Sequence, residues 1–277
     1  MCRKPALAAT ALALLMLASP ALAWGGKKAD AKKTEAKPAA AAPAQHAAPP
    51  KATAADRAAV ERQDPLARAA FWARILDADP RDVEAGLKLS KALREMGRNQ
   101  DAASIAQQVL VVQSNSYEGL LELARAHIGA GAPFFALEPL NQAAALNPKD
   151  WRPLSLAAIA YEATRQPDEA TAAFNAALKL APDTPALLTN HALFLAARGQ
   201  TQAAEADARR AVSLPGSGAK ERQNLALVLG LAGRFDEAEK LIRRDLPPDQ
   251  ADANLAYLRG VSNPANRNWA DVQRTQQ

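Results

Sequence analysis

The sequence predicts an all-α protein built as a solenoid of stacked helical hairpins. A period of 34 residues runs without insertion from Val83 to Gln250, and glycines and small residues recur at fixed places in each period. A single hairpin cannot bury its apolar face alone, so about three or more must stack to form a continuous core. The five periods present here exceed that minimum.

The period divides the chain into five full units, 83–116, 117–150, 151–184, 185–218 and 219–252. In each unit position 15 should form the tight turn between two helices, where glycine is favoured because it adopts conformations that other residues avoid. That position holds Gly97, Gly131, Arg165, Gly199 and Gly233.

Other positions predict how the helices pack. Small residues at positions 8 and 20 allow the paired helices to approach closely: Ser90, Ala124, Ala158, Ala192 and Ala226, then Ala102, Ala136, Ala170, Ala204 and Ala238. Positions 11 and 24 supply larger core side chains, among them Leu93, Tyr161, Leu229, Leu140, Phe174 and Ile242. Prolines before a new unit, Pro80, Pro148 and Pro182, stop one helix and start the next.

The two ends of the array are atypical, as capping units should be. Residues 56–82 form a partial repeat whose helix begins with Asp64 as N-cap and Pro65 in the first turn. At the other end, residues 249–259 predict a closing helix and 260–277 an extended tail. In the fourth unit, 214–218 predicts a flexible loop.

The first 23 residues predict a cleaved signal peptide. Arg3 and Lys4 precede an apolar stretch, and Ala21-Leu22-Ala23 is a signal-peptidase site, so we expect cleavage after Ala23. A retained membrane anchor is the alternative, but spanning a bilayer takes about 20 apolar residues and Ser19-Pro20 interrupts this stretch. The only cysteine, Cys2, lies ahead of the cleavage site, so the mature chain would have no thiol for disulfides, catalysis, zinc or lipidation.

Residues 24–55, rich in Ala, Lys and Pro, predict a disordered linker because they contain almost no large apolar side chain. Contact of its lysines with an anionic envelope surface is the alternative to a simple tether. The net charge of +5 resides in the N-terminal part: Arg3 and Lys4 carry +2 and residues 24–62 carry +4. The rest of the chain is therefore close to −1, which argues against nucleic acid as a partner.

No catalytic or metal-binding constellation stands out, and we expect neither an enzyme nor a cofactor nor a small-molecule substrate. The three histidines, His46, His127 and His191, lack the spacing of a metal pair. His127 and His191 fall at positions where a packed neutral histidine is the simpler interpretation.

The spacings resemble the tetratricopeptide repeat (TPR), and the unit 151–184 resembles it best, through Leu154, Ala158, Tyr161, Ala170, Phe174, Ala177 and Pro182. The resemblance implies a right-handed superhelix in which the first helix of each unit lines a concave groove. The groove would then bind a protein or an extended peptide. The candidate contact residues are Lys88, Lys91, Arg125, Arg152, Asn190, Lys220, Gln223 and Asn224.

Two of these residues indicate peptide binding more sharply. Asn190 and Asn224 both occupy position 6, one period apart, and an amide can donate and accept hydrogen bonds along an extended backbone. The alternative is that they are ordinary soluble groove residues.

The C-terminal part is similar to the TadD family, the TPR component of the tight-adherence (Flp) pilus assembly system. The likeness rests on the run 222–231, then on Gly233-Arg234-Phe235, Asp245-Leu246-Pro247-Pro248 and 253–259. It implies a periplasmic protein that supports assembly or localisation of the pilus secretion machine, with an outer-membrane secretin or another pilus-assembly component as partner. Family members are often lipoproteins, whereas this signal sequence favours a soluble form with no integral membrane segment after cleavage. A generic envelope scaffold, as in polysaccharide export, and a self-associating structural subunit remain alternatives, as does anchoring through an uncleaved N-terminal segment.

Overall fold

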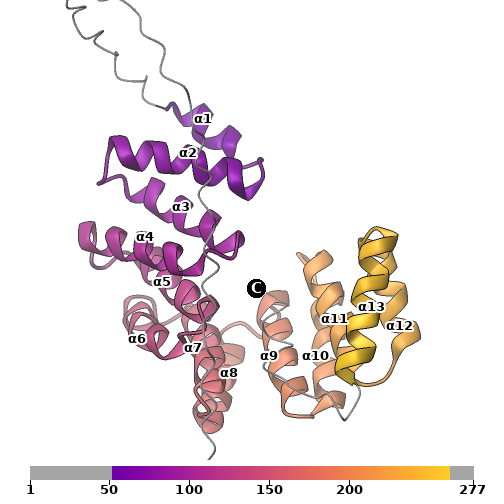
Figure 1. Cartoon of the computed structure of the whole chain (residues 1–277). Helices are drawn as coiled ribbons and strands as arrows, with labels where there is room; N and C mark the ends of the chain where they lie inside the picture. Colours follow the sequence, from indigo (N-terminus) through magenta and orange to yellow (C-terminus); the bar gives the residue numbers. More distant parts are fainter. Residues whose placement is uncertain (1–51, 263–277) are drawn as a thin grey trace, which may run out of the picture. The chain divides into compact units, whose positions relative to one another are not determined.

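The computed structural model describes residues 52–262 (Figure 1), which contain helices and no strand. The predicted signal peptide, the predicted linker up to residue 51 and the predicted tail from residue 263 lie outside these residues. The elements are α1 (Ala54–Val60), α2 (Pro65–Ala78), α3 (Val83–Glu95), α4 (Asn99–Val112), α5 (Tyr117–Gly129), η1 (Pro133–Ala136), α6 (Leu137–Leu146), α7 (Arg152–Ala163), α8 (Pro167–Leu180), α9 (Pro185–Ala197), α10 (Thr201–Ser213), α11 (Ala219–Leu231), α12 (Phe235–Asp245) and α13 (Pro248–Ser262).

The helices follow the 34-residue register, and the all-α solenoid of TPR type is confirmed. The first helices of the five units are α3, α5, α7, α9 and α11, and the second helices are α4, η1 with α6, α8, α10 and α12. Successive first helices contact one another, and each also contacts the second helix of its own unit. Several helices begin with a side-chain cap. Asp64, before α2, accepts from the Ala67 amide at 3.0 Å, and Asp82, before α3, accepts from the Ala85 amide at 2.9 Å.

The turn between the two helices of each unit has the backbone conformation that the glycines predict. Gly97, Gly131, Gly199 and Gly233 have φ between 71° and 79°. Arg165 holds the same place with φ of 62°, which makes it the only described non-glycine residue in the left-handed region. The fold therefore imposes this turn even where the sequence lacks glycine.

Small residues form the contact between the two helices of each unit. The alanines at positions 8 and 20 are all buried, with at most 1% of their surface exposed. In the first unit Ser90 replaces alanine, and its hydroxyl donates to the Ala102 carbonyl oxygen at 2.8 Å. Ser90 thus joins α3 to α4 with a hydrogen bond at the point where the other units rely on packing alone.

Larger side chains fill the spaces between units. Phe174 of α8 is fully buried and its ring lies 5.0 Å from that of Phe194 and 5.2 Å from that of His191, both on α9. At the N-terminal end Trp72 of α2 is fully buried, and its indole nitrogen donates to Glu61 at 3.0 Å. The core thus continues from one unit to the next.

Two boundaries differ from the prediction, and one helix begins irregularly. α1 begins at Ala54, inside the predicted linker, because Thr53 and Asp56 form a capping box there. α13 extends to Ser262, so the tail predicted from residue 260 begins as helix. The second helix of unit 117–150 starts as the 3₁₀ turn η1, because Pro139 has no N–H to donate to the carbonyl of Phe135.

Replacing Arg165 with glycine should stabilise the protein, whereas Gly97→Ala should destabilise it. A left-handed residue with a Cβ costs about 1 kcal/mol, and a Cβ on Gly97 would meet no atom within 4 Å, so the effect there is purely conformational. Urea denaturation of the purified variants measures both changes. Arg165→Ala is the control, because it removes the side chain and keeps the strain; an equal gain from Arg165→Ala would contradict the explanation.

Candidate functional site

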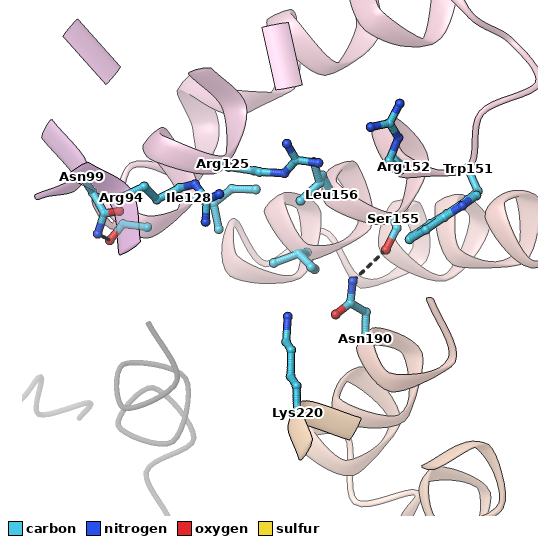
Figure 2. A pocket seen from close by; sticks show the side chains of 12 residues that line it. Arg94, Asn99, Arg125, Ile128, Trp151, Arg152, Ser155, Leu156, Asn190 and Lys220 are labelled. Atoms are coloured by element: carbon cyan, nitrogen blue, oxygen red, sulfur yellow. Dashed lines mark hydrogen bonds between the residues drawn. The ribbon is translucent and has the colours of Figure 1, made fainter. Parts of the chain in front are cut away.

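A pocket of about 370 Å³ opens along the first helices of consecutive units (Figure 2). It is bounded by α3, α5, α7, α9 and α11, together with one residue of α4. Its lining residues are Arg94, Asn99, Arg125, Ile128, Gly129, Trp151, Arg152, Ser155, Leu156, Ile159, Asn190 and Lys220.

The structure brings four of the predicted groove residues together in this pocket: Arg125, Arg152, Asn190 and Lys220. Lys88, Lys91, Gln223 and Asn224 are not among its lining residues. Lys220 and Gln223 are exposed at the start of α11.

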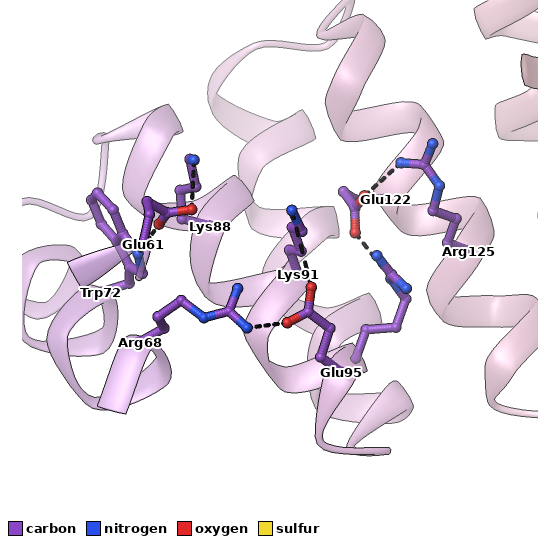
Figure 3. Close-up of polar contacts among 9 residues, drawn as sticks. Glu61, Arg68, Trp72, Lys88, Lys91, Glu95, Glu122 and Arg125 are labelled. Carbon is purple, nitrogen blue, oxygen red and sulfur yellow. Dashed lines mark hydrogen bonds and ion pairs between the residues drawn. The ribbon is translucent and has the colours of Figure 1, made fainter. Parts of the chain in front are cut away.

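Lys88 and Lys91 belong instead to an ion-pair cluster at the N-terminal end (Figure 3). Lys88 lies 2.9 Å from Glu61, which also accepts from the Trp72 indole. Burial opposes ionisation of Glu61, but these two hydrogen bonds outweigh it and hold its pKa below the ordinary value. Lys91 lies 4.0 Å from Glu95, which also pairs with Arg68. Both lysines thus join carboxylates that connect the partial repeat to α3.

Asn224 is 9% exposed, and its side-chain amide donates to the Lys220 carbonyl of its own helix at 3.0 Å. Asn190, one period earlier, lines the pocket and donates from Nδ2 to the Ser155 hydroxyl at 3.1 Å. Ser155 is itself buried, so this bond fixes the Asn190 amide between α9 and α7. The two asparagines are equivalent in sequence and occupy different surroundings.

One carboxylate orders two of the arginines. Glu122, with 8% of its side chain exposed, accepts from Arg94 Nε at 3.2 Å and from Arg125 Nη1 at 2.5 Å. Arg94 comes from α3 and Arg125 from α5, so the pair crosses between two units (Figure 3). A guanidinium has five N–H donors, and each arginine therefore keeps donors beyond those given to Glu122.

Arg152 is more fully engaged. It lies 2.7 Å from Asp150 and 2.9 Å from Glu118, and its guanidinium carbon lies 5.2 Å from the centre of the Tyr117 ring. Burial raises the pKa of Asp150, but hydrogen bonds from the Arg152 side chain and backbone outweigh it and hold that pKa below its ordinary value. Two carboxylates therefore hold the Arg152 guanidinium in place at the pocket and balance its charge.

An apolar wall lies beside these cations. Trp151, Leu156 and Ile159 of the α7 segment and Ile128 of α5 line the pocket and stay partly exposed. Sequence reasoning missed Trp151, Ser155 and Asn99 as lining residues. Trp151 and Ser155 are positions 1 and 5 of their unit, at the start of the first helix, which is the helix expected to line the groove.

Neither described histidine, His127 or His191, lines the pocket. Among the described residues no group of His, Cys, Asp and Glu could hold a metal ion. Burial lowers the pKa of His127. His191 packs on Phe174, lies 2.6 Å from Asp207 and is not among the residues that line the pocket.

Comparison with known proteins supports the fold. A family model described as "Tetratricopeptide repeat" matches residues 154–184, inside the unit that the sequence predicts as most regular. A thermophilic TPR protein of Thermus thermophilus is 24% identical with a TM-score of 0.57, over 64% of this chain and 98% of that chain. A tetratricopeptide repeat protein from Parabacteroides merdae is 19% identical with a TM-score of 0.53, over 74% of this chain and 82% of that one. No curated protein matches the sequence.

At these identities the solved structures establish a likeness of fold alone. The fold and the matched repeat indicate a role in protein–protein interaction or as a scaffold. No helix between residues 52 and 262 has both the length and the apolar character needed to cross a membrane.

Glu122→Gln should lower the free energy of unfolding by about 2 kcal/mol, because it leaves two part-buried guanidiniums without their shared anion. Glu118→Gln removes the same charge from the same helix, but Glu118 is 49% exposed, and we expect a loss below about 0.5 kcal/mol. Urea denaturation compares the two variants. Equal losses would show that Glu122 does not order the pocket arginines.

Proposed function

We propose that this protein is an exported adaptor that holds an extended segment of a partner protein in the groove formed by α3, α5, α7, α9 and α11. The observation that carries the proposal is the pocket itself: consecutive first helices converge on one cavity that offers both hydrogen-bond donors and an apolar wall. Recognition of an extended segment needs this combination, since polar groups meet its backbone and pockets accept its side chains.

The polar lining suits a peptide backbone. Asn190 gives Nδ2 to Ser155, and its amide oxygen can accept from a peptide N–H. Lys220 and Gln223 project from the first turns of the next first helix and add exposed donors. Asn224 no longer supports the proposal, because its amide donates within its own helix.

The proposed location is the periplasm, and the proposed task is assembly or localisation of a Tad/Flp-type pilus secretion machine. The signal-peptide pattern of residues 1–23 supports export, and the similarity of residues 222–258 to the TadD family supports the pilus role. An outer-membrane secretin or another pilus-assembly component would be the partner. Because no cysteine follows the predicted cleavage site, the adaptor would be held in place by its partners and not by a lipid.

A second candidate role is a self-associating structural subunit, and one observation favours it. Large apolar side chains are exposed on the second helices of the units, which are not the helices that form the groove. Phe134 and Phe135 are 68% and 63% exposed, and Val111, Leu146 and Leu180 also face solvent. Exposed apolar groups of this size commonly mark a contact surface.

A photo-crosslinking amino acid in place of Gln223 should capture a pilus-assembly protein in intact cells, because this exposed position borders the groove. The same amino acid in place of Lys179, an exposed residue near the end of α8, is the control and should give no such product. Mass spectrometry identifies the products. Products from Gln223 that never contain a pilus-assembly protein would rule out the pilus role, and identical products from both positions would rule out the groove.

For the second role, light scattering of the mature chain should show an assembly larger than the monomer, and replacing Phe134 and Phe135 with serine should return it to the monomer mass. Removing two exposed aromatic side chains takes away apolar contact area without disturbing the core. A monomer at every concentration would exclude self-association, and the adaptor role would be unaffected.

A further inference from the structure

We infer that the groove selects an acidic segment, one that carries carboxylate side chains next to an apolar residue. The inference rests on the proposed function and names the chemistry of the segment that the groove would hold. Its starting point is the charge of the lining: Arg94, Arg125, Arg152 and Lys220 all line the pocket, and none of its lining residues is acidic.

Two of the carboxylates that pair with these cations, Glu122 and Asp150, are more buried than the cations themselves. Glu122 and Asp150 have side chains only 8% and 14% exposed, so they position the arginines and present little negative charge to the groove. Glu118 is more exposed and is already bound to Arg152. At Arg94 and Arg125 a partner therefore meets the guanidinium groups before their carboxylate.

Two of the cations share one anion. Arg94 and Arg125 divide the single carboxylate of Glu122, which leaves one positive charge in excess there and several N–H donors available, whereas Arg152 is matched by both Asp150 and Glu118. Guanidinium groups bind carboxylates in a two-point geometry, and a pair already held in place by Glu122 has less freedom to lose on binding. Lys220 adds a further cation from α11, near Asn190 (Figure 2).

The apolar wall favours a protein segment over a long polyanion such as a nucleic acid as the ligand. Trp151, Leu156 and Ile159 would be covered by an apolar side chain of the segment, whereas a sugar-phosphate backbone offers none. The residues from Gln63 onward carry a net charge near −1, so the chain as a whole from that point offers a polyanion no net positive charge. A long nucleic acid would be attracted to the cations of the pocket and repelled by the net negative charge of the rest of this region.

This chain's own segments outside residues 52–262 do not fit as occupants. Residues 1–51 contain eight basic and two acidic side chains, and residues 263–277 contain Arg267 and Arg274 with only Asp271. Both segments are net basic, so a cationic groove would repel them. The occupant that the charges favour comes from another protein.

Fluorescence anisotropy with three labelled synthetic peptides tests the inference on the chain 24–277. The peptides share a leucine-containing frame and differ only in carrying glutamate, lysine or glutamine at the alternate positions. We expect the glutamate peptide to bind and the lysine peptide not to bind. Binding of the glutamate peptide should weaken as sodium chloride is raised, because salt screens charges at exposed sites.

Lys220→Glu should weaken binding of the glutamate peptide by roughly fivefold and improve binding of the lysine peptide. Lys220 is the variant of choice because its side chain is exposed at the start of α11, so we expect the fold to be retained. Lys179→Glu makes the same charge change at an exposed residue that does not line the pocket. It should leave both affinities within about twofold of those of the parent chain, because salt screens a charge outside the binding site.

The outcomes separate this inference from the proposed function. Equal binding of all three peptides, or equal losses in Lys220→Glu and Lys179→Glu, would overturn acidic selectivity while leaving a peptide-binding groove. Tighter binding of a single-stranded oligonucleotide than of the glutamate peptide would overturn it in favour of nucleic acid. Failure of every peptide to bind would also overturn it, and the crosslinking from Gln223 would then decide whether the adaptor role survives.

Discussion

Close approach of the two helices within each unit is the constraint on which the rest of the structure depends. Ala124 of α5 and Ala136, like Ala192 of α9 and its counterpart Ala204, are almost completely buried, so a large side chain at these positions would push the paired helices apart. A narrow hairpin presents its remaining apolar side chains outward, toward the next unit. Stacking of the units follows from this, and stacking brings the first helices side by side to form the groove.

The repeated pattern made the fold predictable, because the small residues that allow close helix packing recur at the same positions in all five units. One departure illustrates the limit of reading single residues: Arg165 replaces glycine, yet its backbone adopts the same left-handed turn as Gly131 and Gly199. Packing of the neighbouring helices outweighs the local preference of one residue. η1 illustrates the opposite case, since Pro139 changes hydrogen bonding that no packing can restore.

The candidate site was less predictable, because helical position does not specify which neighbour a side chain will meet. Lys88 and Asn224 occupy groove-type positions, but Lys88 reaches Glu61 and Asn224 reaches its own helix. Several ion pairs between units nonetheless have similar separations in sequence: Arg68 and Glu95 are 27 residues apart, Arg94 and Glu122 are 28 apart, and Arg234 and Glu205 are 29 apart. Opposite charges separated by somewhat less than one period were therefore a signal in the sequence, and scanning for them would have paired most of these residues.

The uninterrupted register also affects how such a protein can change its length. Each unit offers its neighbours equivalent faces, so duplication or loss of one complete unit joins surfaces that already fit. A partial insertion would instead rotate every later helix away from its partner. The row of first helices can thus lengthen or shorten only in whole steps, and gene duplication within the array gives evolution a direct way to change the length of the surface that they form.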